Sequence, residues 1–378
     1  MIFVATCLFG LEKFLGEEID TLGYKRLETI DGRVVFEGDV SAIARFNIWS
    51  RYAERLFVRV GICQAFDFES LFEGTLAMPC EDYIGPDDEF PVTGHSIKSL
   101  LTSIPACQSI VKKAIVNRLM REHGVNTLPE TETKYPIEFF ILNDTATLMI
   151  DTSGTALHKR GYRPTSSFAP LRETLAAALV KTARPREDVL FWDPMCGSGT
   201  IAIEAAMMMN NIAPGLERGF AAMKYDFVPH DIWKRAREEA NDLRLDTAFE
   251  AYASDIDPEC VEITKENCKR AGVVKWVKAF ERNALEIRTG GRRGTIVCNP
   301  PYGERLLTMQ EAEKLYRDMG RHFKTLDNWQ IYVLTSHEGF ERLYGQRADK
   351  VRKLYNGMIK CNYYQFFKKK DFESGKKR

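Results

Sequence analysis

The sequence predicts an open α/β fold whose larger part is a mostly parallel, doubly wound sheet, preceded by two smaller α/β units. Three observations predict this fold. At 378 residues, the chain exceeds one small domain. From residue 166 onwards, buried strand-like runs alternate with helical runs of ten or more residues, which is typical of right-handed βαβ crossovers. Before that point, shorter strands and helices alternate between glycines.

The first unit is expected at residues 1–65. Apolar runs predict strands at residues 1–9 and 33–38, and amphipathic runs predict helices at residues 11–22 and 41–56. The apolar start of the chain has no basic stretch before it and runs directly into the first helix. It is therefore expected to be a strand and not a cleaved signal.

The second unit is expected at residues 66–165. A strand at residues 89–96 precedes a long helix at residues 104–124. Two strands of alternating polarity follow at residues 135–144 and 146–154, joined by an Asn-Asp turn. This pattern indicates another α/β unit.

The third unit, residues 166–378, carries the alternation of helices and buried strands. Its expected strands lie at residues 188–194, 251–257, 277–284, 294–301, 330–336, 350–360 and 363–370. Its expected helices lie at residues 171–183, 201–209, 260–272 and 311–324. The last two strands have little room between them and should be antiparallel. Such a sheet binds its ligand at the carboxyl ends of the strands, near the point where the strand order reverses.

The composition excludes several classes of protein. The chain is 44% hydrophobic and 28% charged, with as many basic as acidic residues, which argues against disorder and against a membrane span. Nine scattered cysteines without a CxxC pair indicate a reduced, cytoplasmic protein. The six histidines lie far apart and none forms an HExxH pattern, so no metal is expected.

The zero net charge hides an uneven distribution. Residues 1–90 carry a net charge of −9, residues 91–165 carry +3, and residues 345–378 carry +8. A basic tail and a mildly basic second unit suit a partner that carries phosphates. For the tail alone, a solvated segment is the plain alternative.

Residues 193–200, Asp-Pro-Met-Cys-Gly-Ser-Gly-Thr, follow an apolar strand and open a helix. The two glycines let the backbone approach a ligand closely, and the free N–H groups at the helix start favour an anionic group. No Lys-Ser/Thr pair follows, as a Walker loop requires, and the third glycine of a GxGxxG motif is missing. A small anionic group is therefore favoured over a pyrophosphate.

A second acidic group ends the next predicted strand, 62 residues after Asp193, because residues 210–246 form an insertion. In dinucleotide-binding folds, the acid that contacts the ribose follows the glycine motif by only about 20 residues. Asp255 can hydrogen-bond both hydroxyls of a ribose, with Ile256 beside an adenine face. The alternative is that Asp255 or Asp257 caps the following helix.

Residues 299–302, Asn-Pro-Pro-Tyr, follow another buried strand. The prolines stiffen this loop, and the Asn299 side-chain oxygen and the Pro300 carbonyl both accept hydrogen bonds. Two converging acceptors suit an NH₂ group on an aromatic base because they direct the nitrogen lone pair outward, and Tyr302 can stack on that base. Taken alone, the segment would be read as an ordinary turn, and its place one strand from the glycine loop favours the functional interpretation.

With these motifs the sequence resembles the class I S-adenosylmethionine-dependent methyltransferases that methylate amines with an (Asp/Asn)-Pro-Pro-(Tyr/Phe/Trp) loop. The N-terminal units, with His-Lys-Arg-Gly-Tyr-Arg at 158–163 leading into Ala-Pro-Leu-Arg-Glu at 169–173, resemble those of the THUMP-containing RNA guanine-N2 methyltransferases. Among these the chain is most similar to the bacterial enzymes that modify 23S ribosomal RNA. The resemblance spans nearly the whole chain. It implies a ferredoxin-like unit at 1–65, a THUMP RNA-binding domain at 66–165 and a Rossmann-like domain with a seven-stranded sheet at 166–378.

By position, the resemblance also assigns roles to individual residues. The residues expected to contact the cofactor S-adenosylmethionine are Asp193, Cys196, Gly197, Ser198, Gly199 and Thr200 at its methionine end, Asp255 and Ile256 at its ribose and adenine, and Asn283 at the adenine amine. Asn299, Pro300 and Tyr302 would hold the target base. Phe168 and the residues after it would close over the cofactor.

The expected reaction is in-line transfer of the sulfonium methyl to the N2 amine of a guanosine in RNA, with 23S rRNA as the first candidate. Positioning is the main contribution and no strong general base is needed, so His322 and His337 are expected to be structural. The alternatives are a transfer-RNA guanine-N2 methyltransferase, a DNA adenine-N6 methyltransferase, and an RNA-binding protein with an inactive methyltransferase fold. The loop at residues 299–302 does not by itself separate guanine N2 from adenine N6.

Overall fold

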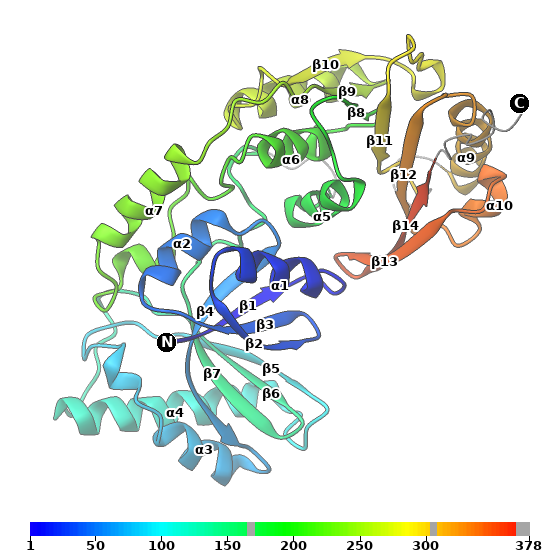
Figure 1. Cartoon of the computed structure of the whole chain (residues 1–378). Coiled ribbons are helices and arrows are strands. Elements are labelled where there is room, and N and C mark those ends of the chain that lie inside the picture. Colours follow the sequence, from blue (N-terminus) through cyan, green and yellow to red (C-terminus); the bar gives the residue numbers. More distant parts are fainter. Residues whose placement is uncertain (165–170, 303–307, 368–378) are drawn as a thin grey trace, which may run out of the picture. The chain divides into compact units, whose positions relative to one another are not determined.

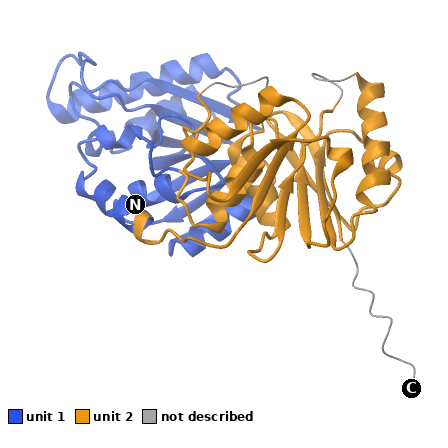
Figure 2. Cartoon of the chain, turned by 90° about the horizontal axis from the view of Figure 1, so that it is seen from above, with its two compact units in different colours: residues 1–7, 12–157, 215–240 blue, residues 8–11, 158–214, 241–378 orange. Residues whose placement is uncertain are grey.

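The computed structural model describes residues 1–164, 171–302 and 308–367. This part of the chain contains two seven-stranded sheets, with strand orders β2-β3-β1-β4-β7-β6-β5 and β10-β9-β8-β11-β12-β14-β13 (Figure 1). The sheets belong to two compact units, which Figure 2 colours separately. Within the described residues, no helix combines the length and the apolar character that crossing a membrane requires.

The first half of the N-terminal sheet has a βαββαβ order. Its elements are β1 (Ile2–Cys7), α1 (Glu12–Thr21), β2 (Lys25–Ile30), β3 (Arg33–Glu37), α2 (Ser41–Trp49) and β4 (Ala53–Gln64). All three strand pairings are antiparallel, as in a ferredoxin-like fold. The rings of Phe3, Phe36 and Phe46 stack with centroids 5.2 and 5.3 Å apart, and their burial holds the helices on the sheet.

The second half continues the same sheet. Its elements are α3 (Phe68–Leu76), the 3₁₀ turn η1 (Cys80–Asp82), β5 (Val92–Ile97), α4 (Ile104–His123), β6 (Ile137–Leu142) and β7 (Thr145–Asp151). Strand β7 pairs antiparallel with β4, which joins the two halves. The predicted Asn-Asp turn between β6 and β7 is confirmed, because Asn143 and Asp144 have φ of 49° and 58°, as a type I′ turn requires.

A segment from the middle of the chain completes this first unit. Gly215–Ala240 lies within the predicted insertion, and it packs with residues 1–7 and 12–157. It contains the 3₁₀ turn η2 (Ala221–Lys224) and most of α7 (Asp231–Asp242). The Tyr225 ring stacks on Tyr135 with centroids 4.3 Å apart, and its hydroxyl donates a hydrogen bond to the Asp151 carbonyl. The insertion is therefore a structural part of the first unit.

The second unit has the doubly wound architecture that the sequence predicts. Its helices are α5 (Glu173–Ala183), α6 (Thr200–Met209), α8 (Pro258–Arg270), α9 (Met309–Phe323) and α10 (Phe340–Tyr344), with the 3₁₀ turn η3 (Ala284–Glu286). Its strands are β8 (Leu190–Asp193), β9 (Ala251–Asp255), β10 (Val277–Glu281), β11 (Gly294–Cys298), β12 (Trp329–Thr335), β13 (Lys350–Asn356) and β14 (Ile359–Phe366). Strands β8 to β12 are parallel, and the closing pair β13 and β14 is antiparallel as expected.

A layer of large aromatic rings supports the parallel strands. Trp192 of β8 lies with its ring 5.2 Å from Tyr252, 5.8 Å from Phe280 and 6.0 Å from Trp329, so one side chain bridges β8, β9, β10 and β12. Its indole N–H donates to the Ser254 hydroxyl at 2.9 Å, which satisfies the buried donor. Burial of each such ring contributes roughly 1.5–3 kcal/mol.

Several elements differ from the sequence-based expectation, and β4, α7 and α10 are among those that were not predicted. The helix predicted to reach residue 56 ends at Trp49, because the Glu18 carboxylate accepts hydrogen bonds from the Ser50 hydroxyl and the Arg51 N–H and turns the chain into β4. Strand β2 was not expected, since its residues are nearly all exposed and show no apolar alternation. Helix α3 was also missed, although Asp67 and Ser70 form a capping box at its start. The strand predicted over 350–360 is split by a turn after Asn356.

The packing of α9 on α10 yields a testable prediction. Alanine in place of glycine normally stabilises a helix interior by about 0.5–1 kcal/mol. A Cβ on Gly320 of α9 would lie 1.9 Å from the Tyr344 carbonyl oxygen, so Gly320→Ala should instead destabilise the protein by about 1–3 kcal/mol. Urea unfolding measures the difference. Gly219→Ala is the matched control, because a Cβ there meets no atom within 4 Å, and equal stability of the two variants would contradict the close packing.

Candidate active site at the carboxyl edge of the second sheet

Parallel pairing brings three of the sequence-predicted site residues to one edge of the second sheet. Asp193, the last residue of β8, pairs with Ala253 of β9, so Asp255 lies two residues further toward the same edge. On the other side of β8, Trp192 pairs with Ile296 of β11, which places Asn299 also just beyond the level of Asp193. The turn after β8 and the loops after β9 and β11 are therefore neighbours.

The two glycines of the loop after β8 have different tasks. Gly197 and Gly199 both have positive φ, 51° and 80°, where glycine is strongly preferred. A Cβ on Gly197 would meet no atom within 4 Å, so this stretch of backbone faces open space. A Cβ on Gly199 would lie 2.6 Å from a methyl carbon of Thr264, so Gly199 serves the packing of α6 on α8.

Helix α8 holds the glycine loop in place. The Thr264 hydroxyl donates to the Gly197 carbonyl at 2.9 Å, and the Asn267 amide donates to the Ser198 carbonyl at 2.9 Å. Cys196 is buried, with its Sγ 3.5 Å from the Thr264 hydroxyl. The loop is therefore preorganised by residues that the sequence did not single out, because side chains of α8 hold two of its carbonyls.

The two aspartates of the loop after β9 make different hydrogen bonds. The Asp257 carboxylate accepts from the Glu259 N–H at 2.9 Å and is the N-cap of α8. The Asp255 carboxylate instead accepts from the N–H groups of Gly197 at 2.9 Å and Asp257 at 3.1 Å, which ties it to the glycine loop. Ile256 next to it is 68% exposed, an unusual position for a large apolar side chain.

Asp193 lies beneath the glycine loop and is 1% exposed. Its carboxylate accepts from the Met195 N–H at 3.3 Å. Burial raises the pKa of Asp193 well above its usual value, and the nearby Asp255 carboxylate raises it further. A buried acid with a strongly raised pKa is typical of functional sites, because packing alone would favour a neutral residue.

Two further residues near the loop were missed by the sequence analysis. Arg163 and Glu173 form an ion pair at 2.7 Å in which both side chains are nearly buried. The Arg163 guanidinium also donates to the Thr200 hydroxyl at 3.0 Å and to the Leu171 carbonyl at 3.2 Å. The pair therefore fixes the start of α6. Phe168, predicted to close over the cofactor, lies outside the described residues.

The Asn-Pro-Pro-Tyr loop is anchored on α9 and closed on itself. The Tyr316 hydroxyl donates to the Pro301 carbonyl at 2.9 Å and lies 3.1 Å from the Thr335 hydroxyl at the end of β12. The Tyr302 hydroxyl donates to the Asn299 side-chain oxygen. Burial raises the pKa of Tyr302 well above its usual value, so this hydroxyl keeps its proton. Asn299 is thereby held in one orientation with one lone pair of its oxygen still available.

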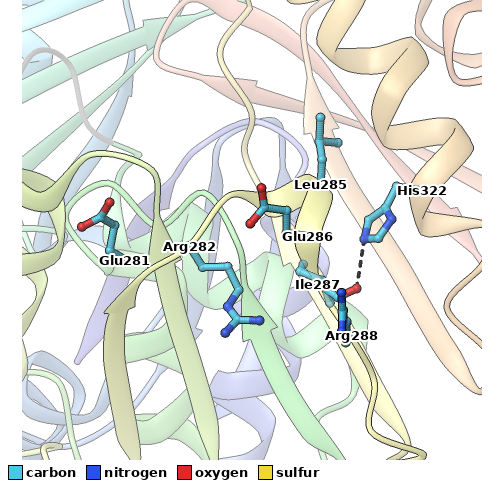
Figure 3. A pocket seen from close by; sticks show the side chains of 7 residues that line it. All are labelled: Glu281, Arg282, Leu285, Glu286, Ile287, Arg288 and His322. Carbon is cyan, nitrogen blue, oxygen red and sulfur yellow. Dashed lines mark hydrogen bonds between the residues drawn. The ribbon is translucent and has the colours of Figure 1, made fainter.

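Asn283 follows β10 and caps the 3₁₀ turn η3, with its side-chain oxygen accepting from the Leu285 N–H at 3.0 Å. An open hollow of about 700 Å³ flanks this turn. Figure 3 shows its lining, with the His322 ring bonded to the Ile287 carbonyl at 3.0 Å. Asn283 does not line the hollow, so the hollow lies beside the predicted site residues and not among them. In the described ranges, no three His, Cys, Asp or Glu side chains gather as they would around a metal ion.

Comparison with known protein families agrees with the fold and with the loops at this edge. Residues 160–365 match the family described as RMKL-like, methyltransferase domain. Residues 2–57 match the RlmL ferredoxin-like domain, and residues 65–151 match the THUMP domain. The three matches follow one another along the chain.

Two relatives illustrate the similarity in sequence. YpsC of Bacillus subtilis strain 168, provisionally named an RNA methyltransferase, is 44% identical over 369 residues, which cover 97% of this chain and 96% of YpsC. Ribosomal RNA large subunit methyltransferase K/L of Legionella pneumophila strain Philadelphia 1 is 32% identical over 374 residues, which cover 95% of this chain and 52% of the relative. The chain thus spans about half the length of the K/L relative.

Two solved structures illustrate the similarity in fold. One, from Listeria monocytogenes str. 4b F2365, is named a predicted N6-adenine-specific DNA methylase; it has a TM-score of 0.92 at 46% identity and covers 97% of this chain and 96% of its own. The other, SMU.472, is provisionally named a methyltransferase and was solved with SAH; it has a TM-score of 0.91 at 39% identity over 98% of each chain.

The fold and the loops at its edge define a class I methyltransferase that uses S-adenosylmethionine as its cofactor. The chain belongs to the RMKL-like methyltransferase family, with RlmL ferredoxin-like and THUMP domains preceding the catalytic domain, and it is an RNA methyltransferase.

The buried carboxyl of Asp193 yields a prediction about pH. When the pKa of an acid is higher in the folded than in the unfolded protein, the unfolding free energy of the protein falls as the pH rises. For Asp193 this fall begins near the unfolded pKa of about 3.9 and ends at the raised folded pKa. Asp193→Asn removes the ionisable group and with it this loss. The unfolding free energy of the variant should therefore exceed that of the wild type, and the excess should be larger at pH 8 than at pH 5. Urea unfolding without cofactor at both values checks this. A difference that shrinks as the pH rises would show that the carboxylate is not penalised by burial.

Proposed function

We propose that this protein transfers a methyl group from S-adenosylmethionine to the exocyclic N2 amine of a guanosine in 23S ribosomal RNA. The observation that carries the proposal is the pairing of β8 with β11, which puts the Asn-Pro-Pro-Tyr loop beside the glycine loop. In this proposal, the cofactor site and the site for an aromatic amine share one edge of the sheet. The ribosomal RNA relatives at 32–33% identity support the choice of substrate.

The residues of this edge fit the cofactor. The open space above Gly197 admits the methionine end, and the start of helix α6 at Thr200 suits its carboxylate. The Asp255 carboxylate is positioned for the two ribose hydroxyls, and the exposed Ile256 offers an apolar surface to the adenine. The full proposed set is Asp193, Cys196, Gly197, Ser198, Gly199, Thr200, Asp255, Ile256 and Asn283.

The chemistry asked of the protein is mainly positioning. When bound, S-adenosylmethionine supplies a methyl group on a sulfonium, which is already a good leaving group. The Asn299 side-chain oxygen and the Pro300 carbonyl accept the two N–H bonds of the guanine amine, so that the nitrogen lone pair points away from the loop. Tyr302 orients the Asn299 amide through its hydroxyl and is expected to contribute ring contact with the base. The nitrogen gives up its extra proton after transfer, for which water suffices.

The substrate class rests on the domains that precede the catalytic one. A THUMP match at residues 65–151 favours RNA over duplex DNA. Adenine N6 is the competing target, because two acceptors fit either amine and one similar structure carries an adenine-specific DNA methylase name. Transfer RNA is the competing substrate. An inactive RNA-binding protein is disfavoured by the complete set of Asp193, Asp255, Asn299 and Tyr302.

The proposed place of action is the cytoplasm. All nine cysteines are free thiols, including those in the core of both units. Free buried cysteines suit a reducing compartment, where ribosomal RNA is also modified.

The ribose assignment predicts a cofactor-binding defect. Asp255→Ala should weaken S-adenosylmethionine binding by about 1–3 kcal/mol, the loss of a charge-assisted set of hydrogen bonds. Asp257→Ala is the matched control two residues away: it should lower helix stability by about 1 kcal/mol and leave cofactor affinity in place. Titration calorimetry on the folded proteins measures both. Equal cofactor affinities for the two variants would rule out Asp255 as the ribose ligand.

The acceptor role of Asn299 predicts a defect in transfer alone. Asn299→Ala should slow single-turnover methylation by about 10²-fold or more and leave cofactor affinity unchanged. Loss of one preorganised hydrogen bond at a reacting atom has an effect of this size in other enzymes. The methylation rate of Tyr302→Phe should lie between the rates of this variant and the wild type, since the substitution keeps the ring and removes the hydroxyl that orients Asn299.

The identity of the target amine is tested with the same assay. The RNA is compared with versions that carry inosine or adenosine at the target position, because inosine lacks the N2 amine. Methylation of the inosine RNA at the guanosine rate, or transfer to adenosine in preference to guanosine, would refute guanine N2 as the acceptor.

A further inference from the structure

The tip of the β13–β14 hairpin lies beside the Asn-Pro-Pro-Tyr loop and extends beyond it. Thr335, the end of β12, pairs with Asn362 of β14, so the residues from Asn362 back to the turn project past the catalytic edge. The Cys361 Sγ lies 4.0 Å from the Tyr302 hydroxyl, which places the base of the projection at the target loop. From Asn362 to the turn, the hairpin extends roughly 10 Å at about 3.4 Å per residue.

The projecting part is cationic. The projecting residues 353–362 contain two basic residues, Lys353 and Lys360, and no acidic one. Lys353 and Lys360 are both exposed, and within residues 1–164, 171–302 and 308–367 neither ammonium forms an ion pair. Lysines that carry no carboxylate partner beside a reaction site suit an anionic ligand.

The same part carries aromatic and apolar surface. Lys360 pairs directly across the hairpin with Tyr355, so the two side chains share a face, and the Lys353 ammonium lies 5.2 Å from the centre of the Tyr355 ring. Phe9, in the segment Leu8–Leu11 of the same compact unit, meets Tyr355 edge-on at 6.1 Å and stays 55% exposed. Met358 at the turn is 97% exposed.

This combination is not explained by folding. Leu354 and Cys361, on the other face of the hairpin, are fully buried and provide its packing. The face of Lys353, Tyr355 and Lys360 contributes little to that core. Aromatic rings interleaved with lysines are how proteins hold unpaired nucleotides, whose bases stack and whose phosphates need cations.

We propose that the tip of the β13–β14 hairpin, defined as Lys353, Tyr355, Met358 and Lys360 together with Phe9, binds the single-stranded RNA that flanks the target nucleotide. Tyr355 and Phe9 stack on a neighbouring base, and the two lysines contact its phosphates. The hairpin thereby holds the strand while the target base occupies the loop at Asn299. This inference rests on the proposed function, because it assumes that RNA reaches this edge.

The test uses the full-length protein and a fluorescein-labelled RNA stem-loop with one unpaired guanosine. Tyr355→Ala should raise the dissociation constant about 5- to 150-fold, the range expected for loss of one stacked base. Lys353→Ala with Lys360→Ala should weaken binding and flatten the dependence of log affinity on log salt by about 1.4, which is two phosphates on a single strand. S-adenosylmethionine affinity should stay at the wild-type value in both.

The matched control is Lys265→Ala with Lys269→Ala in α8. These lysines are exposed and lie toward the β10 edge of the same sheet, opposite β13, so the control removes the same charge at a distance from the hairpin. If the hairpin variants bind RNA with the wild-type constant and salt slope, or lose no more than the control does, the inference is wrong. If the wild type methylates no guanosine RNA at all, the proposed function itself fails, and that result is read from the wild type alone.

Discussion

Parallel pairing of the central strands is the constraint on which the rest of the second unit depends. Once β8, β9 and β11 run in the same direction, each connection must return to the opposite edge, and every strand ends on one side. Asp255 lies 62 residues and Asn299 lies 106 residues after Asp193, yet the strand pairing brings all three to the same edge of the sheet. The aromatic layer around Trp192 holds the strands in that register from below. The loops can therefore vary in chemistry while the scaffold fixes their positions.

The loops themselves are held from outside the strands. Thr264 and Asn267 fix the carbonyls of the glycine loop, Arg163 fixes the start of α6, and Tyr316 fixes Pro301. Each of these donors bonds a group of the loop and restricts its position. Such support from neighbouring helices is what keeps a binding site in one geometry before its ligand arrives.

The sequence predicted those elements whose signal is local. Buried strands such as β8 and β11 stand out as apolar runs, and the Asn-Asp turn carries its own backbone preference. Strand β2 carries no such signal, because its side chains are exposed and only its pairing with β3 makes it a strand. Arg163 was also beyond reach, since its partner Thr200 lies 37 residues away and nothing near either residue indicates the contact. The positions of the motifs could be read from the chain, whereas the groups that hold them required the fold.

The segment Gly215–Ala240 gives the first unit an unusual dependence on chain order. Its partners, Tyr135 and Ile48 among them, are synthesised long before it, and Tyr225 and Gly215 reach them only after the first methyltransferase strand and helix have been made. On the ribosome, the N-terminal unit therefore cannot complete its core as an independent domain that folds first. Its apolar surface stays uncovered until well over half of the chain has emerged. The folding of the two units is thus interdependent, because the first unit contains a segment that lies within the sequence of the second. For the same reason, the first unit cannot be exchanged between proteins as one continuous sequence.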